Sequence, residues 1–451
     1  MTDLRQFRRA TNPIKALNIE NPQDQAYYID FASVRGGKVI TKLKNKITFL
    51  DTDEPTCSLF TGHIGCGKST ELLRLKVELE SENFHVVYFE SSEDLEVTDV
   101  DIVDVLLAIA RRISESMEEN QIKLETTGLR GLLKNVWQGL NAEVRGLEVG
   151  ISKVGEIGGE ATNKEGEYSL SFGIGKITMM TKIDQKLRQQ LNQYLGPKKK
   201  VLIKTINQEL LAPAIAKLKQ QGKEGLVVIV DNLDRVENTV KPFGISQQEY
   251  LFIDQGEYLK GLNCHLVYTM PRSLMFSNNF GRLYNRFGED PNVLPMIPVQ
   301  FKNGTSHEVG MEQLQQMVLA RAFPNLESEQ RLPKISAIFD SPKTLDRLCH
   351  VSGGHVRDLL ILLNTLIMEE MQLPLSGRVL ETVIRSRRSK MTMSISDQEW
   401  ELLRLVKQRK KVSDDIGYQK LIRSHFVFEY IENDESWFDI NPVLAQAPEL
   451  Q

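Results

Sequence analysis

Short runs of apolar residues alternate with longer amphipathic stretches along most of this chain. The runs are bounded by polar residues or proline, as is typical of strands that are buried on both faces of a sheet. They lie at 57–61, 84–90, 226–231 and 266–270, and a run with two prolines at 292–301 suits an edge strand. Helical periodicity occupies the stretches between them, at 70–79, 102–113, 183–195 and 204–221. This alternation predicts an α/β fold with a mostly parallel sheet.

The stretch at 145–180 has a different pattern. Apolar residues alternate with other residues on both sides of a polar turn at 159–166; they are Leu147, Val149 and Ile151 before it, and Tyr168, Leu170, Phe172 and Ile174 after it. Such alternation predicts a β-hairpin, inserted in a region of about 120–200. We expect a surface ribbon that packs one face on the core, or else a contact for an oligomer or a partner. Insertion into a membrane is the least expected use, because charged residues are interspersed.

The remaining pattern divides the chain into four parts. An N-terminal segment spans 1–56, and the α/β core with its inserted hairpin spans 57–306. Helical patterns follow at 307–390. The last part, 391–451, contains two helical stretches at 397–406 and 418–424, followed by apolar strands at 426–431 and 436–440.

Residues 62–69 read Gly-His-Ile-Gly-Cys-Gly-Lys-Ser and match the phosphate-binding pattern G-x-x-x-x-G-K-[ST]. Glycines allow the backbone N–H groups to turn toward a phosphate. Lys68 supplies a positive charge for the β- and γ-phosphates, and the Ser69 hydroxyl is a suitable ligand for Mg²⁺. The motif lies between an expected strand and an expected helix, as this loop requires. We expect the nucleotide to contact the whole segment, namely Gly62, His63, Ile64, Gly65, Cys66, Gly67, Lys68, Ser69 and Thr70.

The run at 226–231 ends in Asp231. A buried strand that ends in a carboxylate is a usual source of the acidic group that holds the metal in such sites. We therefore expect Ser69 and Asp231 to hold Mg²⁺ beside a bound nucleoside triphosphate.

Composition excludes several other classes of protein. The 451 residues carry a formal net charge of −4, so nothing global favours nucleic acid or an anionic membrane as a partner. No apolar run is long enough to span a bilayer, and the N-terminus does not resemble a secretory signal. Four scattered cysteines lack metal-binding spacing and suit a reducing cytoplasm.

The residues after Asp231 carry a family resemblance. The segment Asp231-Asn-Leu-Asp-Arg235 resembles the additional-strand P-loop ATPases, namely the AAA+ ATPases and the related signal-transduction ATPases with numerous domains. In typical AAA+ members a glutamate follows the metal-binding aspartate and orients the attacking water. Asn232 occupies that position here and cannot act as a base, which leaves Asp234 or Glu90 as the candidate and puts fast turnover in doubt. The absence of a guanine-reading motif favours ATP over GTP.

The same resemblance implies three further roles. Thr269 or Arg272, at the end of the strand 266–270, would be the polar sensor of the γ-phosphate. Arg357, after Ser352-Gly-Gly-His355, would be the arginine of the helical lid. Arg282 or Arg286 would approach the site of a neighbouring subunit. We therefore expect four residues to take part in catalysis: Asp234, Thr269, Arg286 and Arg357.

Residues 395–445 resemble a winged helix, and a core with a lid and a winged helix resembles the replication-origin-recognition ATPases. Charge argues against a DNA reader, because residues 395–451 carry seven Lys or Arg against eleven Asp or Glu. The basic run at 385–390 is the best local site for a nucleic-acid backbone. Contact with a protein partner or autoinhibition is favoured over DNA.

These features together predict a cytoplasmic, Mg²⁺-dependent ATPase that couples its nucleotide state to homo-oligomerisation or to control of a partner. The winged helix or the hairpin would contact that partner, and family analogy suggests a bacterial antiviral defence system. Two alternatives stay open: a DNA-binding initiator or loader, and a nucleotide-gated scaffold with little turnover.

Overall fold

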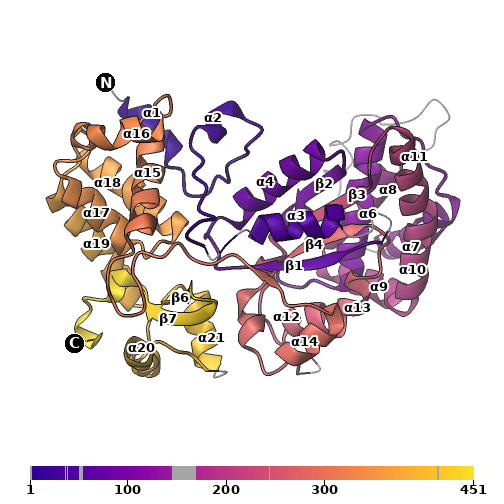
Figure 1. Cartoon of the computed structure of the whole chain (residues 1–451). Helices are drawn as coiled ribbons and strands as arrows, with labels where there is room; N and C mark the ends of the chain where they lie inside the picture. The colour runs from indigo at the N-terminus through magenta and orange to yellow at the C-terminus, as the bar shows by residue number, and fades with distance from the viewer. Residues whose placement is uncertain are drawn as a thin grey trace.

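A computed structural model describes residues 3–35, 37, 39–49, 54–144, 169–242, 244–413 and 416–450 (Figure 1). A parallel sheet lies in one half of the molecule, with helices on both of its faces. The helices that follow residue 307 form the other half, and the C-terminal helices and strands lie beneath them. The N-terminal segment runs between the two halves.

The sheet has five parallel strands in the order β2-β3-β4-β1-β5. The strands are β1 (Cys57–Thr61), β2 (His85–Glu90), β3 (Leu226–Asp231), β4 (His265–Met270) and β5 (Asn292–Val293). The carboxyl ends of β2 and β3 are in register, because Glu90 pairs with Asp231. The α/β fold with a mostly parallel sheet is therefore confirmed.

Continuous apolar runs form these strands because both faces of the sheet are covered. In β3, Val227 and Ile229 pack with α3 (Val39–Phe49) and α4 (Lys68–Ser81), whereas Val228 and Val230 pack with α6 (Ile102–Glu119) on the opposite face. The two sets of side chains alternate along the strand, as the pleat requires.

Helices up to residue 144 are α1 (Leu4–Ala10), α2 (Pro22–Gln25), α3 (Val39–Phe49), α4 (Lys68–Ser81), α5 (Ser91–Asp94), α6 (Ile102–Glu119) and α7 (Thr127–Val144). Those of the later core are α8 (Leu170–Ile183), α9 (Gln185–Leu195), α10 (Lys199–Thr205), α11 (Ala212–Gln220), α12 (Gln247–Glu249), α13 (Gly256–Leu259) and α14 (Phe280–Phe287). A π-helical stretch, Ile206–Leu211, joins α10 to α11.

The second strand of the expected hairpin is wrong, because Leu170–Ile183 forms helix α8. Its buried residues Leu170, Ile174, Ile177 and Thr181 recur at helical spacing, and the helix packs against α6. Ser169 caps it by accepting a hydrogen bond from the backbone N–H of Phe172. The first expected strand and the turn at 159–166 fall outside the described residues.

The second half of the molecule contains α15 (Glu308–Ala322), α16 (Ser328–Arg331), α17 (Pro342–Val351), α18 (Val356–Glu370) and α19 (Gly377–Thr392). These helices share one apolar core with Phe7 of α1 and Phe31. Among the residues described here, no helix is both long and apolar enough to cross a membrane.

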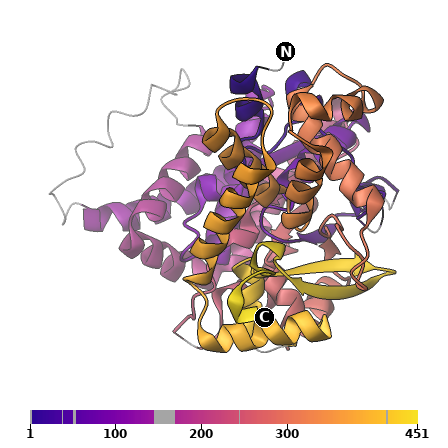
Figure 2. The same cartoon turned by 90° about the vertical axis from the view of Figure 1, so that its left-hand side faces the viewer.

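The C-terminal unit contains α20 (Asp397–Arg409) and α21 (Ile416–Arg423), then the antiparallel strands β6 (Val427–Glu432) and β7 (Glu435–Ile440). Figures 1 and 2 both place α20 along the lower edge of the molecule, with the two strands above it. The expected order of two helices and a hairpin is confirmed.

Candidate nucleotide-binding site

The loop at 62–67 connects β1 to the first turn of α4, so the expected strand–loop–helix context is present. Gly65 and Gly67 have φ of +90° and +104°, a region that side chains with a Cβ rarely adopt. A Cβ on Gly65 would also lie 2.9 Å from the Cβ of Arg357. Glycine therefore allows the loop to bend and α18 to approach it closely.

Lys68 is buried at the start of α4. Its ammonium group donates hydrogen bonds to the carbonyl oxygens of Gly62 and His63, both at 2.9 Å, and pairs with the Asp234 carboxylate at 3.0 Å. Burial acts to lower the pKa of Lys68, but the charge and hydrogen bond of Asp234, together with the other acidic groups nearby, raise the pKa above its ordinary value. The lysine is thus held as a cation inside the loop.

Ser69 and Asp231, which we expect to hold Mg²⁺, lie within hydrogen-bond reach of each other. Asp231 is fully buried at the end of β3, where it accepts a hydrogen bond from the Tyr88 hydroxyl at 2.8 Å and another from Ser69. Burial raises the pKa of Asp231, and the bonds from Ser69 and Tyr88 act in the opposite direction. A hydroxyl and a carboxylate side by side at the start of a helix are ligands that fit Mg²⁺.

Two more carboxylates lie near the loop, Asp234 in the turn after β3 and Glu90 at the end of β2. The Asn232 side-chain amide donates to the Glu90 carboxylate at 2.6 Å, while Asp234 reaches Lys68. The Thr269 hydroxyl is fully buried and accepts from the backbone N–H of Leu233 at 2.9 Å. Thr269 therefore holds this turn in place and does not line the cavity described next.

A cavity of about 270 Å³ lies against the loop, at the junction of three parts of the chain. Ile64 to Thr70 form one wall, and the N-terminal residues 13–17 and 27–31 form a second. Helices α15 and α18 close the third side. Leu17 is fixed to α4 by a hydrogen bond from its N–H to the Thr70 hydroxyl at 3.2 Å.

Cations outnumber carboxylates around this cavity, which suits a polyanionic ligand. The cations are Lys15, Arg35, Lys68, Arg235, Arg321 and Arg357, and the carboxylates are Glu71, Glu90 and Asp234. Arg35, Arg235 and Arg321 were not predicted as site residues from the sequence. Arg235 lay next to the expected site, but no local signal marks Arg35, which donates to the Cys66 carbonyl at 2.7 Å, or Arg321.

Comparisons with known proteins were made for the whole chain. No protein-family model matches the sequence, and no curated protein matches it significantly. Solved structures give weak similarities. The ORC2 protein of Aeropyrum pernix is 11% identical with a TM-score of 0.41 over 91% of each chain. A Walker-type ATPase of Pyrococcus abyssi is 10% identical with a TM-score of 0.40, over 93% of this chain and 98% of that one. A Drosophila ORC structure bound to DNA is 10% identical with a TM-score of 0.39, over 97% of this chain and 88% of that one.

Features of the chain itself define its fold more clearly than these similarities do. The phosphate-binding motif joins the strand β1 of a five-stranded parallel sheet to helix α4, and Asp231 ends a neighbouring buried strand. The chain has a P-loop NTPase fold.

Arg357 reaches this P-loop from the first turn of α18. Its backbone N–H donates to the Gly65 carbonyl at 3.1 Å, and its side chain lines the cavity. Burial, with the nearby charge of Arg235, lowers the pKa of Arg357. The preceding His355 bonds to the Ile64 carbonyl at 2.7 Å, so two consecutive P-loop carbonyls are held by the start of α18.

The other predicted arginines lie elsewhere. Arg272 is buried in an ion pair with Glu429 of β6, with a bond of 2.7 Å from its Nε. Arg286, on α14, donates to the Ile253 carbonyl and pairs with Glu257 at 3.5 Å. It does not line the nucleotide cavity but lies beside Arg282 in a separate surface pocket, and its role in a neighbouring subunit stays a prediction.

The C-terminal unit contacts the opposite side of the P-loop. His63 points away from the cavity, and its Nε2 accepts a hydrogen bond from the backbone N–H of Glu429 at 3.0 Å. Its ring packs edge-on against Phe428, which also stacks on His355. Burial lowers the pKa of His63 well below its ordinary value, as do the nearby charges. The ring is therefore neutral and serves as an acceptor.

Three groups near this contact, His355, Asp358 and His425, offer possible metal-ligand atoms within 4.8 Å of one another. Both ring nitrogens of His355 are already used, because Nε2 bonds to Ile64 and Nδ1 accepts from the backbone N–H of Asp358. This cluster is explained by its role in joining α18 to the P-loop.

Proposed function

We propose that this protein is a Mg²⁺-dependent ATPase switch that transmits its nucleotide state to the C-terminal unit, and so to assembly or to a partner. The observation that carries the proposal is the contact of β6 with the P-loop and with the end of β4. Glu429 bonds to His63 through its backbone and to Arg272 through its carboxylate. A change in the P-loop when phosphates bind would therefore reach β6 through Glu429.

The cavity supports ATP as the ligand. Its cations surround the loop, and the N-terminus of the 14-residue helix α4 faces the position of the phosphates. Lys68 would exchange the carbonyls of Gly62 and His63 for the β- and γ-phosphates when ATP binds, while its ion pair with Asp234 holds it in position. Ser69 and Asp231 would hold Mg²⁺, which neutralises phosphate charge, and Arg357 would approach the γ-phosphate from α18.

This arrangement gives each part of the chain a role. We assign residues 57–306 to nucleotide binding, 307–390 to a lid, and 391–451 to a winged-helix output, with the segment 1–56 closing the cavity. Because ATP and ADP differ in their contacts with Arg357 and Lys68, hydrolysis would move the lid relative to the core. The resemblance of Asp231–Arg235 to signal-transduction ATPases supports homo-oligomerisation and a role in bacterial defence, and the scattered cysteines support a cytoplasmic setting.

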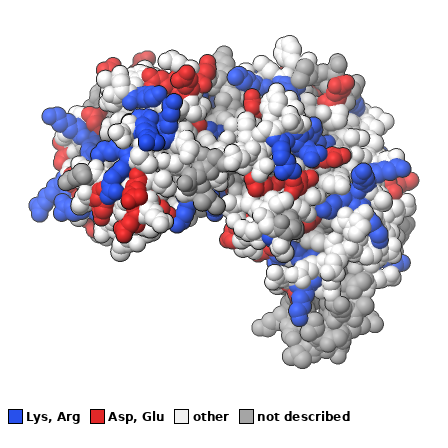
Figure 3. All heavy atoms as spheres, turned by 90° about the horizontal axis from the view of Figure 1, so that it is seen from below, with Lys and Arg blue, Asp and Glu red and all other residues white. Residues whose placement is uncertain are grey.

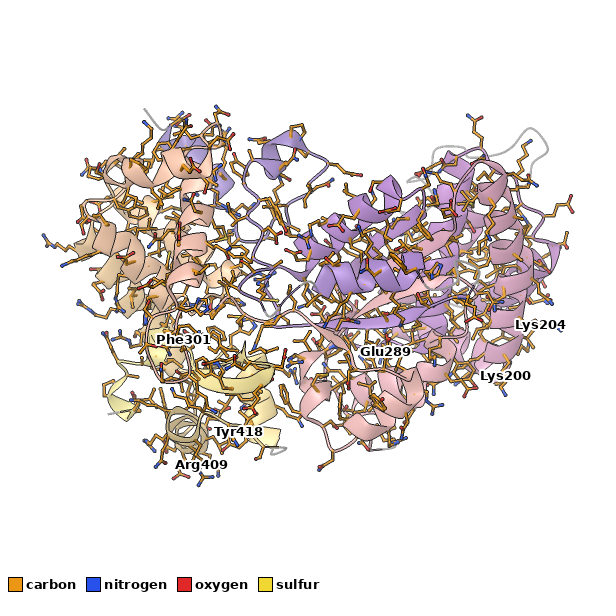
Figure 4. All side chains as sticks on the ribbon, in the orientation of Figure 1. Lys200, Lys204, Glu289, Phe301, Arg409 and Tyr418 are labelled. Carbon is orange, nitrogen blue, oxygen red and sulfur yellow. The ribbon has the colours of Figure 1, made fainter. Side chains whose placement is uncertain are left out.

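DNA is the less favoured partner. Seen from below, basic and acidic side chains of the described residues are interspersed, and these residues form no continuous basic surface on this face (Figure 3). Arg409, at the end of α20, lies at the lower edge away from the P-loop (Figure 4). In the basic run 385–390, Arg388 already bonds to the Val443 carbonyl.

The test combines ATP turnover, ATP affinity and particle mass for the whole chain. We expect the wild type to turn over ATP only with Mg²⁺ and to gain mass with ATP. Lys68→Ala should bind ATP at least tenfold more weakly and should lose both responses. Lys42→Ala, which changes an exposed lysine of α3, is the matched control and should behave as the wild type.

Three other results separate the alternatives. Failure of the wild type to bind ATP would contradict the proposal. Binding and assembly without turnover would indicate a nucleotide-gated scaffold. Turnover that duplex DNA stimulates, with DNA binding that weakens as salt rises, would indicate a loader.

A further inference from the structure

Two carboxylates that line the cavity, Asp234 and Glu90, are candidates to activate the water that attacks ATP. Only one of them has a carboxylate free of a cation. Asp234 pairs with Lys68 at 3.0 Å, and its side chain is 4% exposed. Its second oxygen is also shielded from solvent, and within the described structure it has no hydrogen-bond partner. An incoming water molecule has little access to Asp234.

Glu90 has the opposite environment. It is half-buried at the end of β2 and faces the cavity beside the metal-binding strand, because its backbone pairs in register with Asp231. One carboxylate oxygen accepts from the Asn232 amide at 2.6 Å. Among the described residues, no Lys or Arg forms an ion pair with Glu90. Its other oxygen therefore remains available for a water molecule.

The partner, Asn232, is well suited to hold this carboxylate. It is 3% exposed, and its positive φ of 60° is tolerated by asparagine better than by most residues. Its amide can donate to a carboxylate but cannot itself take a proton. Asn232 thus fixes the position of Glu90 across the ends of two neighbouring strands.

We propose that Glu90 is the catalytic carboxylate that activates water, that Asn232 positions it, and that Asp234 sets the position of Lys68. This inference rests on the proposed ATPase function. The oxygen of a water molecule forms a bond to the γ-phosphorus while the bond from that phosphorus to the β–γ bridging oxygen breaks. The electron pair of the broken bond stays with ADP, and the water proton passes through the Glu90 carboxylate to the phosphate product.

The hydrogen-bonded residues Glu90 and Asn232 allow a direct test, because substitution can move the carboxylate from position 90 to position 232. The variants are Glu90→Gln, Asp234→Asn, and Glu90→Gln combined with Asn232→Glu, all in the full chain. Turnover is measured at saturating ATP with Mg²⁺, and binding is measured separately by titration with the non-hydrolysable analogue AMP-PNP. The unfolding temperature of each variant checks that it is folded.

We expect Glu90→Gln to lose at least 100-fold in turnover while its affinity for AMP-PNP stays within about threefold of the wild type. The double variant should recover at least tenfold over Glu90→Gln, which a merely structural role of Glu90 would not allow. Asp234→Asn should lose mainly affinity, because it disturbs Lys68.

Three results would overturn the inference. They are a Glu90→Gln variant that keeps more than a tenth of the turnover, a double variant no more active than Glu90→Gln, and an Asp234→Asn variant that loses turnover with unchanged affinity. Each leaves the ATPase function standing if the wild type is active. A wild type that binds AMP-PNP but shows no turnover would remove the proposed ATPase activity and this inference together.

Discussion

At the scale of single residues, the P-loop depends on glycine for two separate reasons at Gly65. Its φ of +90° disfavours any residue with a Cβ, and the side of the residue that a Cβ would occupy is filled by Arg357 and His355. The nearest atoms would be 2.9 Å away, closer than side-chain contacts allow. The position thus connects the backbone geometry of the loop to the closeness of α18.

Gly65→Ala should therefore separate α18 from the P-loop. Backbone strain contributes roughly 1–3 kcal/mol of destabilisation, and the clash weakens the bond from His355 to Ile64. We expect a lower unfolding temperature and weaker ATP binding, measured by thermal unfolding and nucleotide titration. Gly281→Ala on α14 is the control, because a Cβ there meets no atom within 4 Å and its stability should be unchanged or slightly higher. Equal stability and ATP binding of Gly65→Ala and Gly281→Ala would contradict this role of Gly65.

At the scale of elements, continuous apolar runs were enough to predict the strands of the sheet. The runs 57–61 and 226–231 coincide with β1 and β3, because strands covered on both faces contain little else. The pattern at 168–174 was ambiguous. Two of the alternating apolar positions, Leu170 and Ile174, also fit one face of a helix that Ile177 and Thr181 continue, and burial against α6 favoured the helix.

The candidate site was only partly predictable, because some of its residues form local motifs and others come together only in the fold. The P-loop and Asp231 are local motifs, so the sequence revealed them directly. The contacts of Arg35 with Cys66, or of His63 with Glu429, join positions far apart in the chain and have no local pattern. The sequence therefore indicated the phosphate end of the cavity but not the N-terminal wall or the contact with β6.

The contact between β6 and the segment that follows β4 depends on the buried ion pair of Arg272 and Glu429. Glu429→Ala would leave the guanidinium buried without its carboxylate, at a cost of roughly 3–5 kcal/mol. We expect the C-terminal unit to loosen, seen as a lower unfolding temperature and faster proteolysis near residues 390–400. Ser436, which donates to Glu429 at 2.7 Å, would also lose its partner.

Two further variants test whether loss of the ion pair causes the destabilisation expected for Glu429→Ala. Glu435→Ala removes an exposed carboxylate at the start of β7 and should have little effect. Adding Arg272→Met to Glu429→Ala should restore much of the stability, because it removes the uncompensated charge. If Glu429→Ala were as stable as Glu435→Ala, the ion pair would not hold the unit in place.

At the scale of the whole molecule, the sheet, the helices α15 to α19 and the C-terminal unit meet around buried imidazoles. His425 joins α21 to β6 and lies 5.0 Å from His355, measured between ring centroids. Burial lowers the pKa of His425 to about 3, and His355, Arg357 and Lys68 act in the same direction, whereas Asp358 opposes them. The junction of the three parts thus requires a neutral ring.

This requirement predicts acid sensitivity of the whole fold. Between pH 6.5, the ordinary pKa, and about 3, the unfolded chain binds a proton at His425 that the folded chain does not. Stability therefore falls as the pH falls through this window, and His63 acts in the same direction. For His425 alone the loss between pH 8 and pH 5 is about 2 kcal/mol.

His425→Asn isolates this contribution. Asparagine tolerates the positive φ of 60° at this position and does not titrate. The free energy of unfolding in urea would be measured for both proteins at pH 8, where the imidazole is neutral whether the chain is folded or not, and again at pH 5. We expect the wild type to lose about 2 kcal/mol more than the variant over this interval, whatever their difference at pH 8. Parallel losses would show that His425 is protonated in the folded protein, and that the three parts of the molecule do not require a neutral ring where they meet.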